Sequence, residues 1–224
     1  HLSLRRQRQM CIRDRSISYI MNDELIYQEH LIPMTRQELI EHLRAALRDK
    51  RFEHVLRVEK TAIELAKQYG VDVEAASIAG LCHDYAKQRA DEDFIKVIKA
   101  KKLDPDLLNY GNAIWHGFVG AEMVKDELGV HDEDILNAIR FHTTGAAYMT
   151  KLAQIIYMAD YIEPGRDFPV VKKARKLTRQ DLGAGVAYQT KHTLLYLIKN
   201  NAPIHPQTLA TFNAWVPQYG KEID

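Results

Sequence analysis

Several features that mark common classes of protein are scarce in this sequence. Two cysteines occur in 224 residues, Cys11 and Cys82, and their separation fits neither a zinc-binding pair nor a disulfide framework. No apolar run approaches the roughly 18 residues that span a bilayer, and the N-terminus lacks the uninterrupted apolar stretch of a secretory signal. We therefore expect a protein of the reducing cytoplasm with no membrane partner.

An excess of charge of one sign is also lacking. The chain has 31 Lys and Arg against 30 Asp and Glu, which gives a formal net charge of +1. This balance argues against a broad nucleic-acid-binding surface, so any attraction for an anionic substrate must be local. A glycine-rich phosphate loop, a serine nucleophile elbow and a His-Glu-x-x-His helix are absent as well.

What the sequence does contain is helical periodicity. Hydrophobic residues make up 46% of it, which is enough for the core of one sizeable domain. Apolar residues recur at helical spacing, and no segment alternates convincingly at period two. Capping residues such as Thr35 and stop residues such as Gly70 delimit the segments. The pattern predicts an all-α helical bundle with helices at about 36–47, 51–69, 72–87, 91–98, 113–128, 132–142, 152–162, 169–178 and 182–200, and a short one after Pro206.

The first residues differ from the rest of the chain. Residues 5–15 are dense in arginine and have neither a helical stripe nor turn chemistry. One interpretation is a basic arm that binds nucleic acid. We favour a disordered or non-native extension over residues 1–33, because residues 9–15 resemble translated sequencing-adapter read-through. Met21 or Met34 would then be the true start, and residues 34–224 form the domain.

Six histidine and aspartate residues carry the strongest functional signal. A lone histidine is more often a packed or surface residue than a ligand, but here the residues form an ordered series in or beside predicted helices. Imidazoles and carboxylates bind borderline and hard metal ions, and a helical bundle can bring them together. The series indicates a metal-dependent phosphohydrolase, with these candidate ligands: His54, His83, Asp84, His116, His142 and Asp160.

The adjacent pair His83-Asp84 stands at the end of an apolar helix. Burying both groups there costs several kcal/mol unless they are paired or bound to metal. A carboxylate has two oxygens, so Asp84 could bridge two ions roughly 3.5–4 Å apart. The alternative is a buried His–Asp hydrogen bond that only closes the helix.

Three positive residues stand near these positions. Arg51 precedes His54 by three residues, Lys87 follows Asp84 by three, and Arg166 follows the Pro-Gly turn after Asp160. Such groups can bind phosphate, and the alternative is ordinary surface charge. The hydroxyl of Thr143, with Thr144 and Gly145, could also donate to phosphate, although a simple turn explains this segment almost as well.

These residues lie within longer motifs that resemble a known family. The motifs are Arg51-Phe52-Glu53-His54, His83-Asp84-Tyr85-Ala86-Lys87, Trp115-His116-Gly117, His142-Thr143-Thr144-Gly145 and Asp160-Tyr161-Ile162-Glu163-Pro164-Gly165-Arg166. They resemble the HD-domain metal-dependent phosphohydrolases, most of all the YqeK-type branch of symmetrical diadenosine-tetraphosphate hydrolases. The resemblance covers about residues 36–216 and is made specific by the last two motifs.

The resemblance implies a site and a reaction. His54, His83, Asp84 and Asp160 would hold iron, with manganese, cobalt or zinc as alternatives. His116 and His142 would bind a second ion, bridged by Asp84, or contact substrate phosphate. Asp84, His116 and His142 are the catalytic candidates, and the substrate-binding candidates are Arg51, Lys87, His116, His142, Thr143 and Arg166.

The implied reaction is symmetrical hydrolysis of a dinucleoside tetraphosphate to two nucleoside diphosphates. One alternative keeps the fold and changes the substrate, giving another nucleotidase or an alarmone phosphohydrolase. A second is a non-catalytic module that binds metal or nucleotide. A homodimer is compatible with the sequence. His205, which lies between two prolines, is either a turn residue or part of the substrate cleft.

Overall fold

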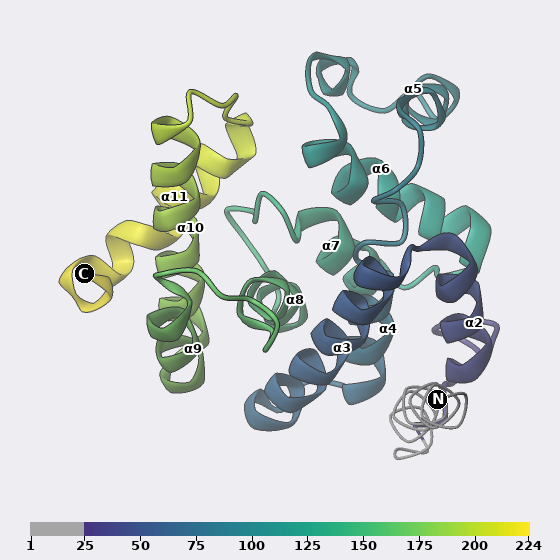
Figure 1. The fold of residues 1–224 in the computed structure, drawn as a ribbon, viewed down its shortest axis with the longest axis horizontal. Helices are drawn as coiled ribbons and strands as arrows, with labels where there is room; N and C mark the ends of the chain where they lie inside the picture. The colour runs from purple at the N-terminus through teal and green to yellow at the C-terminus, as the bar shows by residue number, and fades with distance from the viewer. Residues whose placement is uncertain (1–24) are drawn as a thin grey trace, which may run out of the picture.

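The computed structural model describes residues 25–224, so the expectations for residues 1–24 lie outside it. Within this range the regular elements are helices, and no strand occurs (Figure 1). The predicted all-α fold is confirmed. In chain order the elements are α2 (Arg36–Ala46), α3 (Asp49–Tyr69), α4 (Val73–Cys82), α5 (Asp91–Ala100), η1 (Pro105–Asn109), α6 (Asn112–Leu128), α7 (Glu133–Phe141), α8 (Lys151–Ile162), α9 (Val171–Gln180), α10 (Leu182–Lys199), α11 (Pro206–Tyr219) and η2 (Gly220–Ile223).

Local sequence signals fix most helix ends. Thr35 and Glu38 form a reciprocal capping box at the start of α2, because each side chain accepts a hydrogen bond from the backbone N–H of the other. The Asp72 carboxylate caps α4 in a similar way. Gly70 and Gly129 end α3 and α6 with φ angles of 67° and 72°, in the left-handed region that favours glycine.

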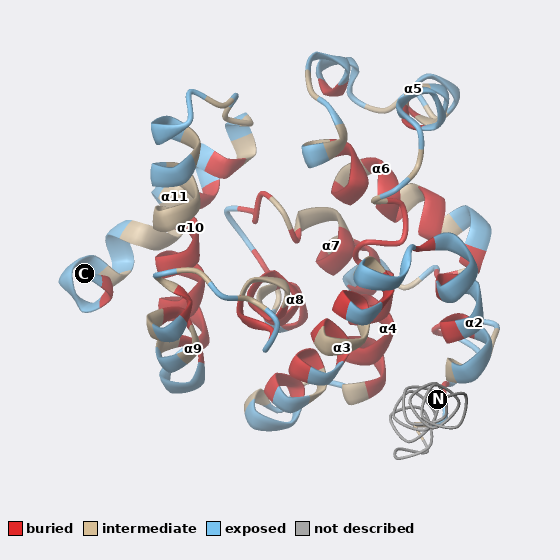
Figure 2. Ribbon diagram, in the orientation of Figure 1, coloured by how far each residue is buried: buried red, intermediate tan, exposed pale blue. Residues whose placement is uncertain are grey.

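The helices α4 and α8 form the centre of the molecule. Both are apolar around most of their circumference, which is the pattern of a buried helix (Figure 2). α4 packs against α3 and α7, while α8 contacts α3, α4, α7 and α10. The two central helices carry His83 at the end of α4 and Asp160 in α8, so the core itself positions candidate ligands.

The last three α-helices, α9 to α11, form a layer that packs against the central helix α8. α10 packs against both α9 and α11 and also contacts α8, so it joins this layer to the core (Figure 1). The first half of α10, from Leu182 to Thr190, is buried, and the residues of its second half are half-buried or exposed. None of the helices in residues 25–224 is both long and apolar enough to cross a membrane.

Packing extends to the N-terminal side of residue 34. Tyr27, Leu31 and Ile32 are buried, and the Tyr27 hydroxyl lies 2.6 Å from the Ser77 hydroxyl of α4. The predicted extension over residues 1–33 remains a prediction. Its arginine-rich part lies outside the described residues, and the part from residue 27 contacts the core.

Two local predictions were wrong, and one short element was not predicted. The third helix ends at Cys82 and not near Lys87, because residues 83–88 form successive turns in which the N–H groups of Tyr85 and Lys87 bond the carbonyls three residues earlier. Residues Pro105–Asn109 form a 3₁₀ helix that the sequence analysis did not predict. The last α-helix has 14 residues and is not short.

Candidate metal centre

The six predicted ligands meet in one cluster. His54 lies on α3, and His83 and Asp84 directly follow the last residue of α4. His116 lies on α6, His142 follows the last residue of α7, and Asp160 lies on α8. Five of them are buried, and the side chain of Asp160 is 22% exposed. The turn after Cys82 matters here. Adjacent residues in a continuous helix point about 100° apart, whereas His83 and Asp84 both face the cluster.

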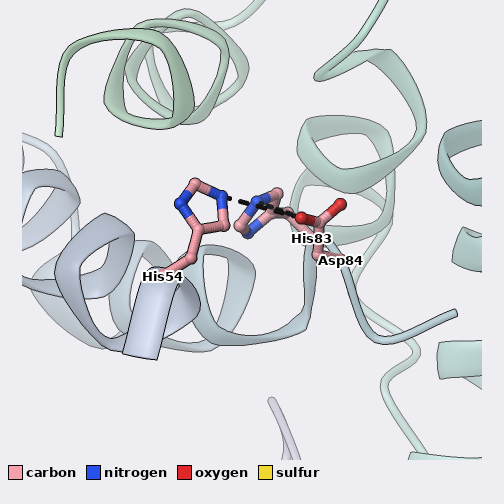
Figure 3. Close-up of side chains that lie close together, drawn as sticks. All are labelled: His54, His83 and Asp84. Carbon is pink, nitrogen blue, oxygen red and sulfur yellow. Dashed lines mark ion pairs between the residues drawn. The ribbon is translucent and has the colours of Figure 1, made fainter. Parts of the chain in front are cut away.

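One oxygen of Asp84 faces two imidazoles. Asp84 Oδ2 lies 3.6 Å from His54 Nε2 and 3.4 Å from His83 Nε2. Figure 3 shows both rings directed towards this carboxylate. Asp160 Oδ1 approaches the same two nitrogens, at 3.1 Å from His54 and 3.8 Å from His83. Two imidazoles and two carboxylates therefore surround one point.

The other oxygen of Asp84 faces a second pair of imidazoles. Asp84 Oδ1 lies 3.5 Å from His116 Nε2 and 3.7 Å from His142 Nε2. These two nitrogens are 3.0 Å apart. The Thr143 hydroxyl lies 3.2 Å from His116 Nε2 and 3.3 Å from that of His142, so it joins this half of the cluster.

The opposite nitrogen of each ring is held by an acceptor. His54 Nδ1 lies 3.1 Å from Glu163 Oε1. Since carbonyls and carboxylates only accept, the hydrogen of each neutral ring sits on Nδ1 and the Nε2 lone pair points into the cluster. For the other three rings the acceptor is a backbone carbonyl at 2.6 to 2.7 Å: Gly80 for His83, Asn112 for His116 and Ile139 for His142.

Burial and mutual contact shift the pKa values of these groups. Burial, aided by a neighbouring imidazole, lowers the pKa of His116 to about 3 and that of His142 to about 4. Both rings are therefore neutral near pH 7. Although burial opposes ionisation, the facing imidazoles hold the pKa of Asp84 well below its usual range. The nearby imidazoles of His54 and His83 and the charge of Arg166 lower the pKa of Asp160, although burial opposes its ionisation.

This arrangement fits a divalent metal ion. His54 Nε2 and His83 Nε2 are buried and have no hydrogen-bond partner, which costs about 1–3 kcal/mol for each. The Nε2 lone pairs of His116 and His142 face each other, a repulsive contact that a cation relieves. Three overlapping sets of ligand atoms lie close enough to hold an ion: His54, His83 and Asp84; His83, His142 and Asp160; Asp84, His116 and His142.

The three predicted cations lie at the cluster. Arg51 Nη1 is 2.6 Å from Asp84 Oδ2, and Arg166 Nη2 is 2.5 Å from Asp160 Oδ1. Lys87 Nζ lies 3.3 Å from the ring nitrogens of His116. Lys87 follows Asp84 by three residues but does not share a helix with it, because α4 has already ended. The turn brings Lys87 to the site by another route.

Sequence reasoning missed two groups that support the cluster. Glu163 bonds His54 and accepts from Arg57, and both could have been found from their three-residue spacing to Asp160 and to His54. The second group, Gln207 and Thr211, belongs to α11. Gln207 Nε2 donates to the Gly145 carbonyl at 2.7 Å and Thr211 Oγ1 donates to the Thr144 carbonyl at 2.9 Å.

An all-α domain around a buried histidine and aspartate cluster defines a helical metal-binding class of protein. The sequence model of the HD domain family matches residues 51–165. The chain is 44% identical over 180 residues to the symmetrical bis(5'-nucleosyl)-tetraphosphatase of Bacillus subtilis (strain 168), covering 80% of this chain and 97% of that protein. The protein of the same name from Halalkalibacterium halodurans is 43% identical, with coverage of 80% and 96%.

A solved structure agrees with these relatives. The crystal structure of a predicted HD superfamily hydrolase involved in NAD metabolism, from Clostridium acetobutylicum, matches with a TM-score of 0.78 and 36% identity. The match covers 83% of this chain and 98% of that one. The chain therefore belongs to the HD-domain family, among the relatives named symmetrical bis(5'-nucleosyl)-tetraphosphatases. The resemblance in the sequence motifs is confirmed.

Proposed function

We propose that this protein hydrolyses diadenosine tetraphosphate symmetrically to two molecules of ADP in a metal-dependent reaction. The observation that carries the proposal is the complete cluster of four imidazoles and two carboxylates in a chain 44% identical to a symmetrical tetraphosphatase. A non-catalytic metal-binding or nucleotide-binding module would be favoured by missing ligands, and all six predicted positions contribute to the cluster.

The residues proposed to hold metal are the six of the cluster. His54, His83, Asp84 and Asp160 would hold a tightly bound iron ion, with manganese, cobalt or zinc as alternatives. His116 and His142 would bind a second ion shared through Asp84, or would contact phosphate, and metal stoichiometry decides between these. A bound divalent ion would lower the pKa of water toward neutrality, so that hydroxide is available near pH 7, and it would offset the negative charge of the phosphates.

Arg51, Lys87 and Arg166 are proposed to hold the phosphate chain. Their side chains reach Asp84, His116 and Asp160, respectively, so positive charge surrounds the cluster on several sides. The Thr143 hydroxyl adds a donor beside His116 and His142. Holding several phosphates in register selects the bond that is broken. The same charges stabilise the negative charge that develops on the leaving ADP.

The reaction adds water across the central anhydride bond. The water oxygen bonds one β-phosphorus, and the bridging oxygen leaves with the other ADP. The proton of the water must be accepted near the cluster, where Asp84 is ionised and the rings of His116 and His142 are neutral. These three residues are the proposed catalytic groups, and each has an atom that can accept a proton.

An aromatic group beside the cluster is proposed to contact a nucleobase. The rings of Tyr110 and Phe118 lie 4.7 and 5.2 Å from that of His205. All three are half-buried. The group adjoins the cluster, because His205 accepts from the Gln207 N–H and Gln207 bonds Thr144, next to Thr143. Aromatic faces suit the stacking of a purine.

The proposal places this reaction in the cytoplasm, on a small soluble substrate. The buried thiol of Cys82 is free, as fits a reducing compartment. Membrane and nucleic acid are not expected as partners, because the charge of the chain is balanced. A homodimer stays open.

Metal analysis of the purified protein, combined with product identification on diadenosine tetraphosphate, tests the proposal. Early-time chromatography should show ADP as the sole nucleotide product. Equimolar AMP and ATP would mean asymmetric attack. A panel with mononucleotides, alarmones and NAD tests other substrates, and turnover of one of them alone would favour a nucleotidase or alarmone phosphohydrolase.

A further inference from the structure

Glu163 lies outside the proposed ligand set but contacts one of its members, His54. It follows the last residue of α8, and its side chain is 2% exposed. One carboxylate oxygen, Oε1, lies 3.1 Å from His54 Nδ1. The other, Oε2, accepts from Arg57 Nε at 2.7 Å and from the backbone N–H of Gly165. A buried carboxylate is thus fully engaged on the far side of His54 from the cluster.

The turn that carries Glu163 is held by hydrogen bonds from a side chain of α9. Arg175 of α9 donates to the carbonyls of Ile162, Glu163 and Arg166 at 2.8 to 2.9 Å. A side chain at Gly165 would place its Cβ 2.6 Å from Arg57 Nε, so any other residue there displaces the guanidinium. The Arg57–Glu163 pair therefore depends on the glycine and on a helix outside the residues that match the HD domain.

His54 differs from the other three imidazoles in this contact. His83, His116 and His142 each bond a neutral carbonyl three or four residues earlier in the chain. His54 bonds a charged carboxylate 109 residues away. A negative acceptor at Nδ1 increases the basicity of Nε2 and fixes the plane of the ring. His54 Nε2 lies among Asp84 and Asp160 without a hydrogen-bond partner.

We propose that Glu163 is a positioning residue for the metal centre, held in place by Arg57, and that it sets the tautomer and donor strength of His54. The inference rests on the proposed role of His54 as a ligand, within the proposed function. It is independent of the substrate, because it concerns affinity for the ion alone. No part of it requires Glu163 to contact metal, since its carboxylate faces the opposite nitrogen.

The test is a Co²⁺ titration of the metal-free protein, followed by visible absorption and without nucleotide. Glu163→Gln keeps the shape and one acceptor oxygen but removes the charge, and we expect Co²⁺ binding to weaken about 10- to 100-fold. Glu59→Gln is the matched control, because Glu59 is equally buried and also pairs with an arginine, Arg36. It should lower thermal stability and leave Co²⁺ affinity close to that of wild type.

Equal Co²⁺ affinity in Glu163→Gln and the wild type overturns the inference, as does an equal loss in Glu59→Gln. Should Glu163→Gln not fold, Arg57→Lys is the second variant. It keeps the charge but loses the contact that Arg57 makes with Glu163 through Nε at 2.7 Å and Nη2 at 3.4 Å, and a smaller loss of affinity is expected. Unchanged affinity there would also count against the inference. If the wild-type protein binds Co²⁺ but does not hydrolyse diadenosine tetraphosphate, that result would instead count against the proposed substrate.

Discussion

The hydroxyl of Thr211 donates to the carbonyl of Thr144 at 2.9 Å, and this bond ties the last α-helix to the loop that follows His142. Gly145 has a φ of 65°, and a Cβ there would lie 2.5 Å from Thr211 Cγ2. The two segments are therefore fitted closely to each other. The loop that carries Thr143 depends on α11, which lies beyond residues 51–165 of the HD domain match.

Thr211→Val should impair both stability and turnover. Valine keeps the shape but leaves the buried Thr144 carbonyl without this donor, which costs about 1–3 kcal/mol. Thermal unfolding and kcat/KM on diadenosine tetraphosphate measure the effect, and metal content should not change. Leu209→Ala, at an exposed position of the same helix, is the control. Wild-type stability and turnover in Thr211→Val would contradict this role of α11.

His83→Ala or Asp84→Ala should remove bound metal and nearly all hydrolysis. Loss of several kcal/mol of transition-state stabilisation corresponds to roughly a thousandfold or more in rate. Elemental analysis and turnover are the measurements, with His131→Ala as a control at an exposed histidine. Near-normal, chelator-resistant turnover of a metal-free double variant would rule out the mechanism.

Arg166→Ala should keep the metal and lose phosphate binding. A charge-assisted hydrogen bond contributes about 1.5–3 kcal/mol, so kcat/KM should fall roughly 10- to 100-fold. Arg179→Ala removes an exposed cation that pairs with Glu64 and should have little effect. If Arg166→Ala loses metal while its fold is intact, its role is to hold Asp160, and our division of roles is wrong.

Tyr110→Ala should raise KM for diadenosine tetraphosphate without changing the metal content. Stacking on an aromatic ring contributes about 1–3 kcal/mol per base, or roughly 5- to 100-fold in affinity. Tyr148→Ala is the matched control, since Tyr148 is 79% exposed. An unchanged KM in Tyr110→Ala would remove the aromatic group from the substrate site.

Ile32→Ala should destabilise the fold by about 2–5 kcal/mol, because this side chain is 1% exposed and its truncation leaves a cavity. Ile26→Ala alters a side chain that is 81% exposed and should stay within about 0.5 kcal/mol of wild type. Chemical denaturation measures both. Equal stability of the two variants would support a domain that begins near residue 34.

Helix positions followed from the sequence because their signals are local. The Thr35–Glu38 capping box and the stop at Gly70 lie within a few residues of the ends they determine. The six candidate ligands were also predictable as a set. The end of α4 was not, because apolar spacing continues past Cys82 while the chain turns to aim His83 and Asp84 at one cluster.

Contacts between distant segments were beyond a local pattern. His54 and Glu163 meet across 109 residues, and Thr144 and Thr211 across 67. Their pairing depends on how α3, α8 and α11 pack, and neither hydropathy nor helical spacing encodes that packing. Arg57 and Glu163 each stand three residues after a predicted ligand, but this spacing does not say what they bind.

The two oxygens of the Asp84 carboxylate determine what its replacement by asparagine, the side chain of the same shape, would change. Its Oδ2 faces His54 and His83, and its Oδ1 faces His116 and His142, so the residue presents the same chemistry in two directions. An asparagine has one acceptor oxygen and one amide group that only donates. In either orientation of Asp84→Asn, one pair of imidazoles therefore faces an NH₂ group in place of a carboxylate oxygen that could bind a metal ion with them. Among the twenty standard side chains, only a carboxylate offers two equivalent anionic oxygens that face in different directions.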